Sequence, residues 1–98
     1  MHRDFFLGFI KIHILHHAAK EPVFGLWLIE ELGGHGYKLS PGTLYPVLHK
    51  LENEKLLCSY EKNVGGRIRK YYRITDEGTA SLTMIKEKMH ELIKEVMS

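Results

Sequence analysis

The sequence predicts a mainly α-helical chain with one small β-hairpin. Four stretches place apolar residues three and four positions apart, which is the period of helices that bury one face. Between residues 56 and 74 the pattern changes to alternation, and the glycines at 65 and 66 divide that stretch into two strands. The order helix, helix, helix, hairpin, helix is that of a winged helix-turn-helix fold with an added C-terminal helix.

Size and composition fit one small folded chain. It has 98 residues, of which 44% are hydrophobic, so it can bury a modest core. No apolar run approaches the roughly 18 residues that span a membrane, and the N-terminal residues do not resemble a signal peptide. The single cysteine, Cys58, excludes an internal disulfide and fits a reducing compartment. We therefore expect a cytoplasmic protein.

The first helix is expected from Asp4 to about Ala19, and apolar residues cover most of its circumference. Such a helix should be buried on more than one side. In so small a chain, we expect a second copy of the protein to cover the second side. The residues of this helix that we assign to a dimer interface are Phe5, Phe9 and Ile12.

A second helix is predicted from about Val23 to Leu32, because Lys20, Glu21 and Pro22 break the first. Its inward stripe contains Leu28, whereas Trp27 fits either the core or a dimer interface. The glycine-rich segment 33–36 should end this helix, since glycine tolerates positive φ angles. A phosphate-binding loop is disfavoured here, because no GK[ST] sequence follows and no strand precedes.

The third helix has the pattern expected of a recognition helix. Ser40 can cap its N-terminus, and Pro41 suits the first helical position. Pro46 should clash with the carbonyl four residues back, but that residue is Gly42, whose bare backbone can shift aside. The inward stripe consists of Leu44, Val47, Leu48 and Leu51. The outward face is small, hydroxyl-bearing and basic, which suits close approach to a phosphate backbone; it carries Gly42, Thr43, Tyr45, Pro46, His49, Lys50 and Asn53.

A hairpin is predicted directly after this helix, with strands at 56–62 and 67–74 and a turn at 63–66. Alternation predicts that Ile68, Lys70, Tyr72 and Ile74 face inward, and that Arg67, Arg69, Tyr71 and Arg73 face outward. Four cations lie within residues 67–73 without an acid between them. Beside a recognition helix, such a wing favours phosphate or minor-groove contact over a merely solvated sheet edge.

The last helix should begin with Thr75 as its cap and two acids in its first turn. Its apolar residues follow the seam of a coiled coil, and we assign them to dimerisation: Leu82, Ile85, Met89, Leu92 and Val96. Residues 1–75 are expected to form a winged-helix DNA-binding domain, and residues 76–98 a C-terminal dimerisation helix. Charge supports this division, because residues 1–75 hold eleven Lys or Arg against seven Asp or Glu, whereas residues 76–98 hold three against five.

Two segments, LSPGTLYPVLHKLE at 39–52 and GGRIRKYYRITDEG at 65–78, closely resemble the PadR family of bacterial and archaeal transcriptional regulators. The resemblance implies a winged-helix homodimer that binds a pseudo-palindromic operator, usually as a repressor released by a small molecule. No cofactor is expected. The matching residues that the resemblance places at DNA are Ser40, Gly42, Thr43, Tyr45, Pro46 and Lys50 on the helix, and Gly66, Arg67, Arg69 and Lys70 in the wing; we add His49 from its place on the same helix face.

Three positions depart from the family pattern. Many members have glycine where Lys55 stands, and the second helix often reads Gly-Tyr-Glu where this chain has Gly25-Leu26-Trp27. Some short members stack aromatic ligands on a tryptophan of the last helix, and this chain has none there. We therefore carry over no particular effector from the family.

Two other functions stay open. A metal-responsive regulator is conceivable, because His13 and His17 are four residues apart on one helix and could share a metal with His2, Cys58 or His90. The simpler interpretation is that these histidines are polar breaks in an apolar helix. A winged-helix module that binds only proteins is the other alternative. We expect no enzymatic activity, since no nucleophile–base or paired-carboxylate motif is present.

Overall fold

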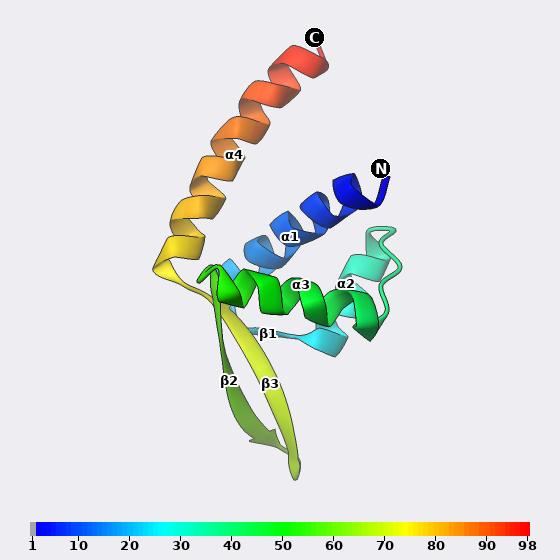
Figure 1. Cartoon of the computed structure of the whole chain (residues 1–98), viewed down its shortest axis with the longest axis vertical. Helices are drawn as coiled ribbons and strands as arrows, with labels where there is room; N and C mark the ends of the chain where they lie inside the picture. The colour runs from blue at the N-terminus through cyan, green and yellow to red at the C-terminus, as the bar shows by residue number, and fades with distance from the viewer. Residues whose placement is uncertain (1) are drawn as a thin grey trace.

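The computed structural model describes residues 2–98 and confirms the mainly helical winged helix-turn-helix architecture. Figure 1 shows the first helices of the chain packed against the base of a small sheet, with the hairpin projecting to one side and the last helix to the other. The elements in chain order are α1 (His2–Lys20), β1 (Val23–Phe24), α2 (Gly25–Gly34), α3 (Pro41–Asn53), β2 (Leu57–Val64), β3 (Arg67–Ile74) and α4 (Asp76–Val96).

The core lies where α1, α2 and α3 meet the base of the sheet. The side chains of Ile14, Leu28, Leu44 and Tyr72 have no exposed surface, and each comes from a different element. The predicted inward stripe of α3 is buried throughout. Burial of such apolar side chains is the main favourable contribution to folding, so this cluster fixes how α3 is held.

The second helix begins later than the sequence pattern predicted. Val23 and Phe24 form a short strand, β1, which pairs antiparallel with Tyr72 and Tyr71 of β3. The helix therefore starts at Gly25, after Phe24 with its extended backbone. Apolar periodicity did not distinguish a helical turn from a two-residue strand here, because the pairing partner lies about fifty residues further on in the sequence.

The end of α2 closes in a Schellman motif. The Tyr37 N–H donates to the Leu32 carbonyl at 2.9 Å, and the Gly36 N–H donates to the Gly33 carbonyl at 3.1 Å. Gly36 takes the left-handed conformation that this motif requires, with φ of +89°. Six residues, 35–40, then connect α2 to α3.

The third helix begins at Pro41 and continues through Pro46, as predicted. Ser40 occupies the N-cap position, but its hydroxyl donates to Thr43 Oγ1 at 3.4 Å and makes no cap bond to a backbone N–H. After Asn53, Lys55 has a φ of +65° and the Leu56 N–H donates to the Leu51 carbonyl. Lys55 thus stands at the left-handed position of a second Schellman motif, which explains why glycine would suit this position.

The sheet has the order β1-β3-β2, and β2 extends to Val64 rather than ending at Lys62. Only Gly65 and Gly66 form the turn, both with positive φ, which is the usual composition of a two-residue hairpin loop. Of the face predicted to point inward, Tyr72 is buried, but Ile68 is 65% exposed. Figure 1 shows the hairpin extending away from the helices. Ile68, the second residue of β3, borders an open groove that it shares with Leu26 and Tyr45.

The last helix is capped as predicted. Thr75 Oγ1 accepts a hydrogen bond of 2.9 Å from the Gly78 N–H, and the Thr75 hydroxyl itself donates to the Lys55 carbonyl. Leu82 is buried against the core, whereas Leu92 is 61% exposed. The second half of α4 therefore projects without a packing partner among residues 2–98. Among residues 2–98, no helix is both long and apolar enough to cross a membrane.

Candidate nucleic-acid interface

The outward face of α3 is open to solvent. Thr43 is partly covered by its neighbours. The remaining predicted contact residues of this segment are exposed, namely Ser40, Gly42, Tyr45, Pro46, His49 and Lys50. With its opposite stripe fully packed, the helix is held rigidly and presents these side chains outward.

Tyr45 lies in a groove that also contains the basic residues of the wing. This groove has a volume of about 280 Å³ and joins α3 to the β1–α2 junction and to β3. Gly25 closes it at one side, where a Cβ atom would lie only 2.7 Å from Tyr45 Cζ. The predicted residues that the fold brings together in this groove are Tyr45, Arg67, Arg69 and Lys70.

The wing arginines have two different environments. The Arg69 guanidinium stacks over the ring of Phe24, with Cζ 4.1 Å from the ring centre, and its Nη1 donates to the Tyr71 hydroxyl at 3.5 Å. Cation–π stacking of this kind orients a guanidinium, so Arg69 is partly buried and fixed in direction. Arg67 and Lys70 are exposed and remain available to a phosphate. At the tip, Asn63 Oδ1 accepts a hydrogen bond from the Gly66 N–H at 3.0 Å.

The other flank of α3 faces α1. A shallow groove there is lined by Thr43, Pro46 and Lys50 from α3 and by Arg3 and Lys11 from α1. These two α1 cations were not among the predicted contact residues. Their spacing does place residues 3, 7 and 11 on one helical face, but no local pattern indicates that this face borders α3.

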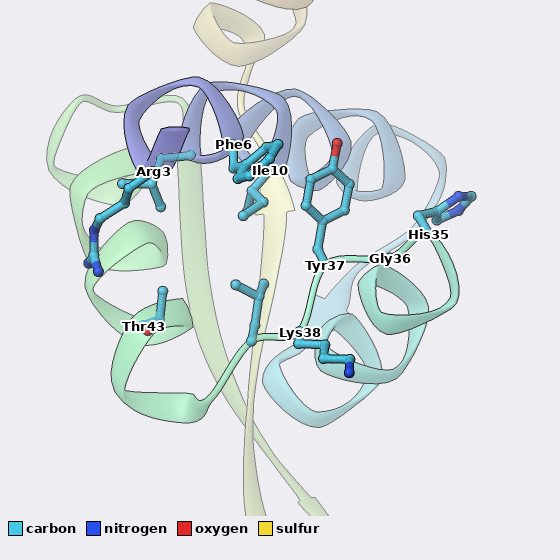
Figure 2. A pocket seen from close by; sticks show the side chains of 10 residues that line it. Arg3, Phe6, Ile10, His35, Gly36, Tyr37, Lys38 and Thr43 are labelled. Carbon is cyan, nitrogen blue, oxygen red and sulfur yellow. The ribbon is translucent and has the colours of Figure 1, made fainter. Parts of the chain in front are cut away.

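Between α1 and the α2–α3 loop lies a pocket of about 530 Å³. Figure 2 shows Phe6 and Ile10 of α1 and Tyr37 of the loop around its interior, with Thr43 of α3 at one side. The rings of Phe6 and Tyr37 meet edge to face, with centroids 6.2 Å apart. Arg3 and Lys38 add positive charge to the walls. The pocket is therefore mainly apolar with cationic groups and borders the start of α3.

Apolar residues on α1 and α4 remain exposed. On α1, Phe5 is 63% and Phe9 is 49% exposed, and Ile12 is partly buried. Among the predicted dimer residues of α4, Leu82 and Ile85 belong to the core of this chain, whereas Met89, Leu92 and Val96 are exposed. Phe9, Ile12, Leu82 and Met89 line a groove between the two helices. Exposed apolar surface of this extent is uncommon on a monomeric protein.

A helix with one packed and one open face, followed by a basic hairpin that shares a groove with it, defines a winged helix-turn-helix protein. Comparison with known proteins gives the family. A model described as "Transcriptional regulator PadR-like family" matches residues 14–84. The chain belongs to the PadR-like family of transcriptional regulators.

Individual relatives agree with this assignment. A curated relative, "Transcriptional regulator Rv3488" of Mycobacterium tuberculosis, is 50% identical over 95 residues, which cover 97% of this chain and 89% of the relative. A solved PadR family regulator from Eggerthella lenta has 37% identity and a TM-score of 0.81, over 91% of this chain and 79% of that one. A PadR-like regulator from Bacillus cereus has 34% identity and a TM-score of 0.82, over 91% of this chain and 88% of that one.

Proposed function

We propose that this regulator is a homodimer that binds a pseudo-palindromic DNA operator and acts as a repressor released by a small-molecule effector. The observation that supports this most directly is the groove shared by Tyr45 and the wing cations. A helix face with small side chains can enter the major groove, while neighbouring cations contact phosphates. The outward side chains of α3 would contact the bases, and Arg67 and Lys70 would contact phosphates and so position the helix on the DNA.

The apolar surfaces on α1 and α4 support the dimer. Leu92 and Val96 lie on the projecting half of α4, and both are more than 60% exposed. A second copy that packs α4 against α4 or α1 would remove this surface from water, at about 25 cal/mol per Å² of apolar area. Two recognition helices would then stand in a twofold arrangement, which matches a palindromic operator.

The pocket between α1 and the α2–α3 loop supports an effector. It is apolar within and cationic at its walls, which suits a small aromatic or aliphatic anion. Because it borders Thr43, an occupant would contact the segment that begins the recognition helix. Such an occupant would change DNA affinity only as far as it binds the free and the DNA-bound conformations differently.

The proposal is tested by titrating the protein against duplex DNA by fluorescence anisotropy at several salt concentrations. A phosphate-binding dimer should show a steep decrease of affinity with salt. Arg67→Ala removes one phosphate contact per protomer. The slope of log affinity against log salt concentration should therefore become shallower by about two for the dimer. Tyr45→Ala should weaken binding without dissociating the dimer.

The matched control is Lys88→Ala, which removes the same charge from α4, where Lys88 pairs with Glu91 at 3.4 Å. This variant should bind duplex as the parent protein does. If Arg67→Ala and Tyr45→Ala also bind like the parent, the interface is assigned wrongly. Duplex binding that is absent even at low salt would favour a module that binds only proteins.

Dimerisation is tested by sedimentation velocity. Leu92→Glu should shift the protein toward monomer at micromolar concentration, because a charge would be buried in the interface. Met84→Glu is the control, since Met84 is 57% exposed and lies off the predicted seam. A parent protein that sediments as a monomer would contradict the dimer.

A further inference from the structure

Three histidines from two helices meet on the side of the molecule beside the effector pocket. His13 and His17 lie four residues apart on one face of α1, and His35 is the C-cap residue of α2. One ring nitrogen of each lies within 4.8 Å of those of the other two. The rings of His13 and His35 stack with their centroids 5.0 Å apart. His2, Cys58 and His90, which the sequence offered as further ligands, are not members of the group found among residues 2–98.

The backbone around this cluster is fixed by local structure. The helical period places His13 and His17 on one face of α1. The Schellman motif at the end of α2 sets the position of His35, and Tyr37 then packs edge to face on His13 with centroids 5.5 Å apart. The cluster is thus a consequence of how α1 and the end of α2 pack, and not of a mobile surface loop.

One nitrogen of the cluster is buried and unsatisfied. His17 Nε2 is inaccessible to solvent and has no hydrogen-bond partner among residues 2–98. A buried polar atom without a partner costs free energy, so its presence points to a ligand. Glu31 Oε1 lies 3.7 Å from this nitrogen, beyond hydrogen-bond distance. Glu31 Oε1 also lies 3.5 Å from His35 Nε2.

The protonation state suits a metal ligand. Burial lowers the pKa of His13 and of His17 below the ordinary value of an imidazole. A lowered pKa favours the neutral imidazole, which has the lone pair that a metal requires.

We propose that His13, His17, His35 and Glu31 form a binding site for a zinc ion. Three imidazoles and one carboxylate are a common donor set for tetrahedral zinc. With zinc–ligand bonds of about 2.0–2.1 Å, a regular tetrahedron places its ligand atoms about 3.3–3.4 Å apart. Glu31 is not a member of the three-histidine group, but its Oε1 lies 3.7 Å from His17 Nε2 and 3.5 Å from His35 Nε2, which is close to this value. The imidazole nitrogens, which lie within 4.8 Å of one another, must approach by up to about 1.4 Å, and the half-exposed side chain of His35 has room to move.

The competing explanation is an ion pair. Glu31 and His35 are four residues apart on α2, and a protonated His35 would pair with this carboxylate without any metal. That explanation leaves His17 Nε2 without a hydrogen bond, whereas a zinc ion satisfies all three imidazoles and the carboxylate together.

The site has a consequence that rests on the proposed function. His35 opens the connection that runs to Ser40 at the start of α3. A bound ion would join α1 directly to this connection and so restrict how the recognition helix sits relative to α1. Zinc would then change the affinity for DNA, whereas zinc binding itself depends only on the histidine cluster.

The test is a titration of metal-free full-length protein with zinc sulfate at pH 7.5, followed by calorimetry and by competition with a chromophoric chelator. The parent should bind one zinc ion per chain with micromolar or tighter affinity. His17→Gln and His35→Gln should each weaken this binding at least tenfold. His90→Gln is the matched control, since His90 lies on the exposed part of α4 and should leave zinc affinity unchanged.

Circular dichroism identifies any variant that does not fold. If His17→Gln does not fold, His35→Gln still tests the site, because the side chain of His35 is half exposed and its substitution should leave the fold intact. The zinc site is contradicted if the parent protein does not bind zinc with micromolar or tighter affinity. It is also contradicted if a folded His35→Gln protein binds zinc as tightly as the parent does. Duplex titration with and without zinc tests the consequence separately. A parent protein that binds zinc but no duplex contradicts the proposed function and supports the site.

Discussion

Gly78 lies in the first turn of α4, against Leu56 and Ile74, and Gly78→Ala should destabilise the protein. In an open helix this change would stabilise by about 1 kcal/mol, because alanine has the higher helix propensity. Here an added Cβ atom would collide with the carbonyl oxygen of Leu56 and lie 2.7 Å from Ile74 Cγ1. The Leu56 carbonyl cannot yield easily, since it accepts the Thr75 N–H at 3.1 Å.

The clash of the added Cβ atom should cost more free energy than the higher helix propensity of alanine contributes. Overpacking costs about 1–3 kcal/mol, and a shift of α4 would weaken the Thr75 hydrogen bonds at about 0.5–1.5 kcal/mol each. After the gain in propensity is subtracted, we expect a net loss of about 2–4 kcal/mol. For a chain of this size, that corresponds to a fall in Tm of roughly 10–20 °C by calorimetry at fixed protein concentration.

The matched control is Gly33→Ala in α2, where an added Cβ would meet nothing within 4 Å. Helix propensity alone then applies, so Tm should stay the same or rise by a few degrees. A Gly78→Ala protein as stable as the parent would refute the argument that α4 is fixed against the end of α3 by this contact.

Three further substitutions test other contacts. Lys55→Gly should raise the free energy of unfolding by about 0.5–1 kcal/mol in denaturant titration, because Lys55 has a φ of +65°; a loss of stability would contradict the strain argument. Tyr72→Phe should be neutral or stabilising by up to about 1 kcal/mol, because the buried Tyr72 hydroxyl has no hydrogen-bond partner among residues 2–98; a marked loss would reveal a partner for it. Gly25→Ala should displace the Tyr45 ring and weaken duplex binding about tenfold while the fold is retained, and unchanged affinity would show that the position of Tyr45 is unimportant.

Much of this fold could be predicted from the sequence, because local chemistry determines it. The stripe from Leu44 to Leu51, the Thr75 cap and the glycine turn of the wing are each encoded within a few residues, and all are present in the structure. Two long-range features could not be predicted in this way. The strand at Val23 exists only because β3 offers an edge to it, and Ile68 is exposed because the hairpin extends past its support.

The candidate DNA-binding site and the histidine cluster also combine features that the sequence predicts with features that depend on long-range packing. The residues of α3 and of the wing could be named from their spacing and from a family resemblance, but their joint groove depends on the packing of Gly25 against Tyr45. Sequence spacing suggested His13 and His17 as a pair. The third histidine, His35, could not be identified, because only the packing of α2 on α1 places it beside them.

In the proposed complex, two copies of α3, each with its wing, bind one operator. Selection of binding sites from a pool of random duplexes tests it most directly. A dimer that binds in this way should select a palindromic consensus whose half-sites are centred about one helical turn, 10–10.5 base pairs, or a multiple of this apart. Recovery of a single unrepeated half-site, or of no consensus at all, would contradict the claim.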